Sequence, residues 1–411
     1  MQKMDCRREQ MEKVAWVIPS FIEGSGGYRT IFQHVNEMAK SYECHIYVYD
    51  SGDYKNDEAV AKAAEKFYGK CNCKFILGYD ISTEVDYVMI FATSWLTAET
   101  VYLYKGKAKK VYFVQDYEPM FYPAGDEYLR AAGTYELGFY HITIGRWLAK
   151  KLQDTHGAKA AYYDFGVNEK IYNSVKGVER ENSICFIFQP DKPRRATQLG
   201  IDALEIVKTC YPDIKIYLYG SKAKIQVPFQ CTFLGIIRPE ECAELYRKSV
   251  VGLCISASNP SRVPFEMMAC GLPVVDVYTE NNLYDYTDNI VLAQSSPEAL
   301  AQAIIDLIKN PDMCKKIKYN ANEFIKKRHI AEENKKFMDI VYSIKLGETN
   351  NYFENKIYRS YRLKMVNASY EITELRRKIS LMKKKTIIEK LEHNSIIRRI
   401  PGIKNLRNWL R

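Results

Sequence analysis

The feature that most constrains the fold is a repeated alternation of short apolar runs with longer segments of helical spacing. Val14–Ile18 is predicted to be a strand, a glycine-rich turn follows, and Tyr28–Lys40 has the apolar spacing of a helix before the next strand, His45–Tyr49. Further strands are predicted at Lys74–Leu77, Tyr87–Phe91, Val111–Val114 and His141–Ile144. Strands that alternate with helices form βαβ units with parallel strands. The first half of the chain is therefore predicted to be a doubly wound α/β domain.

A second series of the same kind begins at Ser183. Its strands are predicted at Ser183–Phe188, Ile214–Tyr219, Cys231–Leu234, Val251–Ile255 and Val274–Val277. Its helices are predicted at Ala196–Thr209, Pro239–Lys248, Pro264–Ala269, Pro297–Lys309 and Met313–His329. Two doubly wound sheets in series leave a linker near Phe165–Val178 and place a cleft between two Rossmann-like domains.

We therefore expect the chain to be divided into four parts. A length of 411 residues agrees with more than one core, because a single hydrophobic core seldom grows beyond roughly 250–300 residues. The expected parts are an N-terminal Rossmann-like domain over residues 1–172, a second such domain over 173–330, a helix over 331–350 that returns toward the first domain, and a basic amphipathic helical tail over 351–411.

The positive charge of the chain is concentrated in this tail. Residues 351–411 hold 16 Lys and Arg against 5 Asp and Glu, and the whole chain has a net charge of +10, so the remainder is nearly neutral. Apolar residues recur at helical spacing, first from Tyr358 through Leu363 to Met365 and then from Ile379 to Leu391. Two interpretations stay open: a charged helical arm, or an amphipathic helix that contacts a membrane surface or a partner protein. No nucleic-acid partner is expected.

Cysteine usage and hydropathy indicate a cytoplasmic protein. The 11 cysteines are scattered, and only Cys71 and Cys73 lie within two residues of each other, which favours reduced thiols over disulfides or a zinc site. The N-terminus lacks the apolar core of a signal peptide, and no apolar stretch approaches the ~20 residues of a membrane-spanning helix. We therefore expect a cytoplasmic location, peripheral at the inner face of the cell membrane if the tail binds lipid.

Two turns could bind phosphate. Gly24-Ser25-Gly26-Gly27 follows the first strand and precedes a helix, where backbone N–H groups suit an anion, although any tight turn can use glycine. Lys192-Pro193-Arg194-Arg195 lies between the first strand and first helix of the second domain, at the edge of the sheet where ligands of such folds bind. Its guanidinium groups could clamp a diphosphate, or the segment could be a solvated basic turn.

Glu266 is the carboxylate that stands out in the second domain. It follows a strand and a loop of small and polar residues, just after the predicted helix start at Pro264. A carboxylate there could complement the helix dipole or accept the ribose hydroxyls of a nucleotide, and spacing alone does not separate these roles. Metal chemistry has little support, because the six histidines are dispersed and no Asp-x-Asp motif occurs. We expect neither a metal nor another cofactor.

Several segments together resemble a known family. The run Phe233–Asp276 contains SNPSRVPFEMMACGLPVVD and resembles the retaining GT-B glycosyltransferases of family four, whose donor site reads Glu, seven residues, Glu, then a small-residue helix, Gly and Pro. VQDYEPMFYPAGDEY (Val114–Tyr128), QPDKPRRATQLGIDAL (Gln189–Leu204) and DFGVNEKIY (Asp164–Tyr172) are similar to the subgroup that includes dTDP-rhamnosyltransferases of bacterial surface glycans. The likeness spans residues 14–289.

This resemblance implies a GT-B fold with an acceptor-side first domain and a second domain that binds a nucleotide-sugar. It implies that Glu266 holds the nucleotide ribose, that Arg194 and Arg195 hold the diphosphate, and that Asp116 faces the transferred sugar or the acceptor. Asp116, Arg194 and Arg195 are the expected catalytic residues. The further substrate-binding residues that it implies are Gly26, Gly27 and Tyr28 near the donor phosphates, Gly220 at the base site, and Gln115, Gln189, Ser258 and Pro264.

Three positions depart from the family pattern. Ser258 stands where the wider family has its first Glu, which removes a carboxylate contact to the sugar and agrees with a deoxysugar donor. Gln115 replaces a His of the catalytic site in many relatives. Gln189 replaces an Arg that is usual in the subgroup, so one guanidinium near the phosphates is lost.

The expected function is transfer of a sugar, L-rhamnose from dTDP-rhamnose, to a hydroxyl of a surface glycan or a lipid-linked acceptor. The family implies retention of anomeric configuration without a metal. Alternatives are a transferase that uses a UDP- or GDP-sugar, a GT-B epimerase, and a non-catalytic scaffold that binds a nucleotide-sugar within a glycan assembly complex. A dinucleotide oxidoreductase is disfavoured because the glycine-rich turn lacks the GxGxxG fingerprint.

Overall fold

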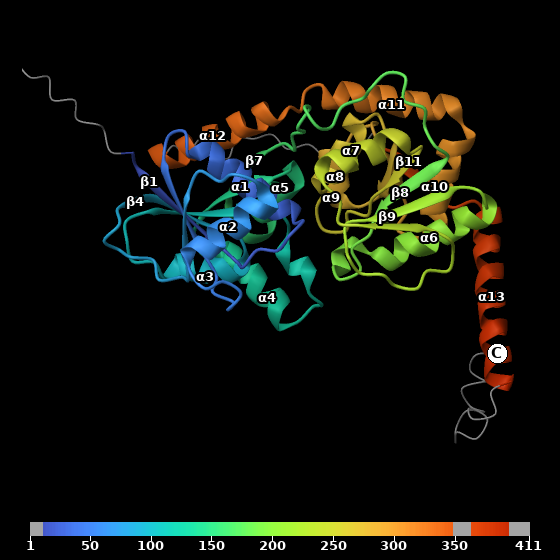
Figure 1. Ribbon diagram of the computed structural model, residues 1–411, viewed down its shortest axis with the longest axis horizontal. Coiled ribbons are helices and arrows are strands. Elements are labelled where there is room, and N and C mark those ends of the chain that lie inside the picture. The colour runs from blue at the N-terminus through green and yellow to red at the C-terminus, as the bar shows by residue number, and fades with distance from the viewer. Residues whose placement is uncertain (1–10, 348–362, 394–411) are drawn as a thin grey trace, which may run out of the picture.

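Two α/β lobes lie side by side in the computed structural model, which describes residues 11–347 and 363–393 (Figure 1). The N-terminal lobe is drawn in blue to teal, with the orange helix α12 (Ile330–Leu346) packed on it, and the C-terminal lobe is drawn in green to orange, with the red helix α13 (Tyr370–His393) attached to it. Each lobe contains one parallel sheet of seven strands with helices packed on it. The predicted fold class, two doubly wound Rossmann-like domains, is confirmed.

The strand order in each sheet is that of a doubly wound fold. The N-terminal sheet has the order β3-β2-β1-β4-β5-β6-β7, and the C-terminal sheet the order β10-β9-β8-β11-β12-β13-β14. The strands of the first sheet are β1 (Lys13–Ile18), β2 (Glu43–Val48), β3 (Lys74–Leu77), β4 (Tyr87–Ala92), β5 (Lys109–Val114), β6 (Tyr140–Ile144) and β7 (Lys159–Tyr163). Those of the second are β8 (Ser183–Ile187), β9 (Lys215–Tyr219), β10 (Thr232–Gly235), β11 (Val251–Leu253), β12 (Val274–Val277), β13 (Val291–Ala293) and β14 (Met365–Val366).

Helices connect the strands and cover both faces of each sheet. In the N-terminal lobe they are α1 (Gly26–Met38), α2 (Asp57–Tyr68), α3 (Trp95–Leu103), the 3₁₀ turn η1 (Glu118–Phe121), α4 (Asp126–Gly133), η2 (Thr134–Glu136) and α5 (Arg146–His156). In the rest of the chain they are η3 (Pro193–Arg195), α6 (Thr197–Cys210), α7 (Pro239–Lys248), α8 (Arg262–Ala269), α9 (Glu280–Asp285), α10 (Pro297–Lys309), α11 (Pro311–Ile325), α12 (Ile330–Leu346) and α13 (Tyr370–His393).

Burial on both faces explains why the central strands are continuous apolar runs. Every residue of β1 after Lys13 is buried, and the strand pairs in parallel with β2 and β4. The Trp16 ring stacks on Phe91 of β4, with ring centres 4.4 Å apart. Strands of a parallel sheet are expected to be apolar on both faces because helices cover both. This is why the run at residues 14–18 predicts its strand so well.

The C-terminal tail differs from the prediction. Helical spacing was expected to run through Leu363 and Met365, but Met365 and Val366 form β14, which pairs with β13 at the sheet edge. Helix α13 then packs on α6 and α10 through Ile372 and Ile379, which are 8% and 6% exposed. The open edge of β13 and the apolar face of α10 offer this segment more contacts than a free helix has. The rest of the predicted tail, residues 351–362 and 394–411, lies outside the described residues.

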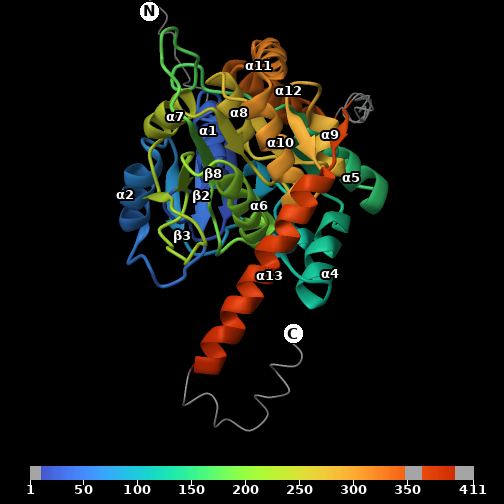
Figure 2. The ribbon, with the colours of Figure 1, turned by 90° about the vertical axis from the view of Figure 1, so that its right-hand side faces the viewer.

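Helix α13 projects away from the two lobes beyond its docked first half (Figures 1 and 2). Leu381 and Met382 in this part are 49% and 59% exposed. Within the described residues no helix combines the length and apolar character that crossing a bilayer requires.

Candidate nucleotide-sugar site

A cavity of about 420 Å³ lies between the lobes. The glycine-rich turn after β1, the segment after β5, the basic turn after β8 and the start of α8 all contribute to its wall, so it sits at the carboxyl ends of both sheets. This is where α/β folds bind their ligands, and the volume falls within the roughly 300–1,000 Å³ of small-molecule pockets. The predicted residues that line it are Gly26, Gly27, Tyr28, Gln115, Asp116, Gln189, Arg194, Arg195, Gly220 and Glu266.

The glycine-rich turn leads directly into α1. Ser25 is the N-cap residue, and Gly26 and Gly27 form the first turn of the helix at the cavity wall. A Cβ added at Gly26 would meet no atom within 4 Å, so the space beside the helix start is open to a ligand. The positive end of α1 and its free N–H groups therefore face the cavity, as phosphate binding requires.

Gly24 brings the turn against the C-terminal lobe. Its φ of +76° is in the left-handed region, and a Cβ there would lie 2.9 Å from the Ile236 side chain. Both conditions favour glycine. The turn thus bridges the lobes at the cavity rim.

The basic turn Lys192–Arg195 contributes three cationic residues to the cavity wall. Arg194 Nε lies 3.4 Å from Asp116 Oδ2 of the opposite lobe. Among the described residues, the Nε atoms of Arg194 and Arg195 are buried without a hydrogen-bond partner. Buried donors normally have partners, so these two are suited to an anionic ligand.

Ala196 follows these arginines with φ +40°, the only positive φ of a non-glycine residue in the described part of the chain. Such a backbone conformation costs of order 1–3 kcal/mol and clusters at functional sites. Ala196 lies between η3 and α6, and its conformation sets the angle between the basic turn and the helix that follows.

Glu266 lies deeper in its helix than the sequence predicts. Helix α8 begins at Arg262 rather than Pro264, so Glu266 is its fifth residue and lies beyond the first turn. Its side chain lines the cavity, and the residue is 9% exposed. Burial raises the pKa of its carboxyl, and the charges of Arg29 and Arg262 partly oppose that shift. This position favours a ligand contact over simple complementation of the helix dipole.

The segment after β5 places two carboxyls at the cavity. Burial raises the pKa of Asp116, and the nearby Arg194 and Arg195 guanidinium groups counteract this. Burial raises the pKa of Glu118 further, to about 8. Glu118 accepts the Trp95 N–H at 2.9 Å and the Tyr112 hydroxyl at 3.2 Å, and so fixes η1 to the start of α3.

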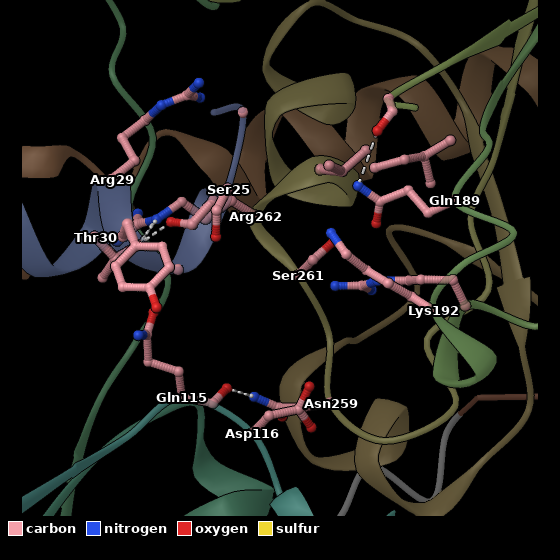
Figure 3. Close-up of a pocket in the computed structure, with 18 of the residues that line it drawn as sticks. Ser25, Arg29, Thr30, Gln115, Asp116, Gln189, Lys192, Asn259, Ser261 and Arg262 are labelled. Carbon is pink, nitrogen blue, oxygen red and sulfur yellow. Dashed lines mark hydrogen bonds between the residues drawn. The ribbon is translucent and has the colours of Figure 1, made fainter. Parts of the chain in front are cut away.

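Gln189, labelled in Figure 3, and Gly220 both line the cavity. The Gln189 amide donates to the Gly220 carbonyl at 3.2 Å. Gly220 has φ +102°, and a Cβ there would lie 3.2 Å from Ile187. The Gln189 amide thus fixes the backbone at Gly220, directly after β9. The sequence did not predict this role for Gln189.

Two predicted residues do not line the cavity in the described structure. Ser258 is 2% exposed, and the cavity wall begins with its neighbour Asn259. Pro264 is also buried, and because α8 starts at Arg262 this proline lies in the first turn, where its missing N–H costs nothing. Both residues therefore lie behind the wall, and the Ser258 side chain hydrogen-bonds Asp116, which does line the cavity.

Residues that were not predicted as site residues complete the wall, and several belong to contacts between the lobes. Of those labelled in Figure 3, Ser25 and Lys192 lie in the two candidate phosphate-binding turns, and Asn259, Ser261 and Arg262 lie in the run that resembles the glycosyltransferase family. Arg29 and Thr30 lie in neither. The Asn259 amide of the C-terminal lobe donates to the Gln115 carbonyl at 3.0 Å and the Ile144 carbonyl at 3.3 Å, both in the N-terminal lobe. The role of Asn259 depends on how the two lobes meet, and a local sequence motif does not show this.

Arg262 is the most connected of these residues. Its guanidinium pairs with the buried Glu333 of α12, donates to the Gly166 carbonyl at 2.9 Å, and reaches the Thr30 hydroxyl at 3.1 Å. Glu333 also accepts the Gly166 N–H at 2.6 Å and the Gln33 amide at 2.9 Å. This network joins α1, α8, α12 and the connection between the lobes.

No group of three or more His, Cys, Asp or Glu side chains in residues 11–347 and 363–393 is arranged to hold a metal ion. The residues that line the cavity carry guanidinium, ammonium, amide, hydroxyl and carboxyl groups. The wall can therefore offer a diphosphate cations and N–H donors of its own.

Comparison with solved structures identifies the architecture. Sucrose-phosphate synthase from Thermosynechococcus elongatus aligns with a TM-score of 0.63 at 15% identity, over 82% of this chain and all of that one. Anabaena HepE in complex with UDP and glucose aligns with a TM-score of 0.64 at 16% identity, over 81% of this chain and all of that one. WaaG, a glycosyltransferase of lipopolysaccharide biosynthesis, aligns with a TM-score of 0.59 at 11% identity, over 80% of this chain and 99% of that one.

The chain has the GT-B fold. Its cavity is the cleft between the two GT-B lobes. Residues 182–305, within the C-terminal GT-B lobe, match the family model described as the C-terminal domain of WsaF.

One curated relative extends the likeness across both GT-B lobes. It is the O-antigen biosynthesis protein RfbC of Myxococcus xanthus, 27% identical over 326 residues, which are 76% of this chain and 26% of that protein. The chain thus spans about a quarter of the length of this relative.

Proposed function

We propose that the protein is a glycosyltransferase that transfers a sugar from a nucleoside diphosphate to a hydroxyl of a bacterial surface glycan or a lipid-linked acceptor. The observation that carries this proposal is the meeting, in one cleft, of Glu266, the unpartnered Nε atoms of Arg194 and Arg195, and the N-terminus of α1. A carboxylate suits ribose hydroxyls, and cations with a helix N-terminus suit a diphosphate.

The comparisons support the same class. HepE, which shares the fold, was solved with UDP and glucose, and the named function of RfbC is O-antigen biosynthesis. We propose dTDP-rhamnose as the donor on the resemblance of the QDYEP and PRR segments to rhamnosyltransferases and on the absence of a carboxylate at Ser258. UDP- and GDP-sugars are the competing donors.

The proposed reaction needs no covalent intermediate with the protein. The bond from the anomeric carbon to the phosphate oxygen breaks, and a bond to the acceptor oxygen forms on the same face of the sugar. The departing phosphate takes the acceptor proton. Arg194 and Arg195 would stabilise the charge that develops on the diphosphate, and Asp116 would orient a hydroxyl of the sugar or acceptor.

Closure of the lobes would serve this chemistry. The cross-lobe contacts of Arg262 and Asn259 bring the two walls of the cleft together. A closed cleft excludes water, so transfer to the acceptor is favoured over hydrolysis of the donor.

We also propose that the tail brings the enzyme to its acceptor at the cytoplasmic face of the cell membrane or on a partner protein. The docked part of α13 uses Ile372 and Ile379 inside the molecule, so the contact would involve the projecting part that carries Leu381 and Met382. A liposome flotation assay of the full chain with anionic and neutral vesicles tests this proposal. Flotation with neither vesicle would contradict the membrane contact.

A donor screen tests the proposed activity. Purified protein is incubated with dTDP-, UDP- and GDP-sugars and a bacterial membrane extract, and the products are analysed by mass spectrometry. We expect transfer from one nucleotide-sugar, greatly reduced in Glu266→Ala and Arg195→Ala and unchanged in Glu58→Gln, an exposed carboxylate on α2. Consumption of none of these donors, together with no thermal stabilisation by dTDP, UDP or GDP, would refute the proposal.

A further inference from the structure

Arg194 belongs to the C-terminal lobe, but groups of the N-terminal lobe hold its guanidinium. Its Cζ lies 4.1 Å from the ring centre of Phe121, and the guanidinium lies over that ring. Asp116 Oδ2 is 3.4 Å from Nε, which remains without a hydrogen-bond partner among the described residues. The side chain is only 23% exposed. Arg194 is thus held across the cleft by a ring face and an ion pair.

Phe121 is well suited to hold another side chain because its own backbone is fixed. It ends η1, whose first residue, Glu118, accepts the Trp95 N–H and the Tyr112 hydroxyl. The Glu118 N–H in turn donates to the Tyr135 hydroxyl at 3.1 Å. These bonds tie the short turn to α3, β5 and η2 and leave its aromatic end at the cavity wall.

The contact between Arg194 and Phe121 is a cation–π contact, which leaves the guanidinium able to bind a ligand. A ring face attracts the cation above it through its quadrupole and has no oxygen or nitrogen acceptor that would occupy the guanidinium N–H donors. A hydrogen-bonding neighbour would use those donors. Arg194 can therefore be fixed in position and still present N–H groups to a diphosphate.

We propose that Phe121 is a positioning residue that holds Arg194 for the donor diphosphate, so that the acceptor-side lobe completes the donor site of the other lobe. The inference rests on the proposed function, because it takes a nucleoside diphosphate as the ligand. It assigns a role to the Phe121 side chain beyond packing. The N-terminal lobe then controls the charge that meets the leaving group.

Calorimetric titration of the full chain with a nucleoside diphosphate and the matching monophosphate tests this role. The probes are dTDP and dTMP, with the UDP and UMP, and GDP and GMP pairs run in parallel. Phe121→Leu and Phe121→Met remove the ring and keep apolar bulk, and Phe121→Tyr keeps the ring. Phe67→Leu is the matched control, since Phe67 on α2 has Lys66 5.8 Å from its ring and lies outside the cavity wall.

We expect Phe121→Leu and Phe121→Met to weaken diphosphate binding by about 3- to 10-fold, the size of a desolvated cation–π contact, with a smaller loss for the monophosphate. Phe121→Tyr and Phe67→Leu should bind as the wild type does. In an Arg194→Ala background, Phe121→Leu should have no further effect, because the side chain that it positions is absent.

Two results would overturn the inference while leaving the proposed function intact. One is wild-type diphosphate affinity in both Phe121→Leu and Phe121→Met. The other is an equal loss for diphosphate and monophosphate, or a loss that persists undiminished in the Arg194→Ala background, either of which would place the effect of the ring elsewhere. If the wild type bound none of the three diphosphates, the proposed function itself would fail.

Discussion

Glu118 is a buried carboxyl whose surroundings favour its neutral form. Burial raises its pKa to about 8 from an ordinary value of 4.5. Between these two values the folded state keeps a proton that the unfolded state has released. The contribution of Glu118 to stability therefore falls as the pH rises through this window. Once the carboxyl is fully ionised, this loss of folding stability is on the order of 3–5 kcal/mol.

Replacing Glu118 with Gln should remove this pH dependence. The amide can accept the Trp95 N–H and donate to the Tyr112 oxygen, so both hydrogen bonds can be kept. We expect Glu118→Gln to gain stability relative to the wild type as the pH rises from 5.5 to 9, measured by urea unfolding at a series of pH values. A stability difference that is constant across this range would show that Glu118 does not titrate there.

The sequence predicted the residues of the cavity wall that follow strands, and it missed residues that reach the wall through contacts between the lobes. Glu266, Arg194 and Arg195 follow strands of the sheets, and strand ends in such folds meet at the ligand edge. Arg29 belongs to no motif, and Asn259, although it lies in the SNPSRVPFE run, makes its contacts with the other lobe, which spacing along the chain does not show. Ser258 is buried behind the wall beside Asp116, a placement that sequence spacing could not give because it does not fix side-chain direction in an irregular loop.

Helix α13 is the element whose role the structure changes most. Ile379 is 6% exposed against α6 and α10, whereas Leu381, two residues later, is 49% exposed. Ile379→Asp should lower the free energy of unfolding by about 2–4 kcal/mol, because it buries a charge and leaves a cavity. Leu381→Asp is the matched control and should have little effect. Equal melting temperatures of the two variants would contradict the docking of α13.

Ion pairs add to the docking of this helix. Arg376 lies 2.9 Å from Asp202 and 3.4 Å from Glu205, and Lys383 lies 2.6 Å from Glu205. Part of the basic charge of the tail is therefore balanced within the molecule. Deleting residues 351–411 would remove β14 and α13 with their packing, so the flotation assay of the tail uses the full chain.

Elements with continuous apolar runs or clear amphipathic spacing were predictable, and those that depend on tertiary contacts were not. The strand at residues 14–18 is apolar on both faces, and it was predicted. Strand β14 has two residues and exists because β13 offers it an edge. The predicted helix Met313–His329 instead ends as α11 at Ile325, and α12 begins at Ile330, because residues 326–329 form a turn near the connection between the lobes.

The two lobes are joined by buried polar contacts at the level of the whole molecule. Glu333→Ala should leave the Arg262 guanidinium, which is 15% exposed, without its carboxylate. Breaking a buried pair in this way costs about 3–5 kcal/mol. Glu332→Ala, at the exposed neighbouring position, is the control. Chemical denaturation of both variants measures the effect, and equal stability would contradict the role of this network in joining the lobes.

The central claim is that the cleft binds a nucleoside diphosphate through groups of both lobes. Isothermal titration calorimetry of the wild type with dTDP, UDP and GDP tests it most directly, alongside Glu266→Ala, Arg195→Ala and the surface control Glu58→Gln. We expect one diphosphate to bind the wild type and the control equally, and to bind Glu266→Ala and Arg195→Ala at least about tenfold more weakly, since each loses a charge-assisted contact. Binding of no diphosphate to the wild type, or undiminished binding to both cavity variants, would contradict the account.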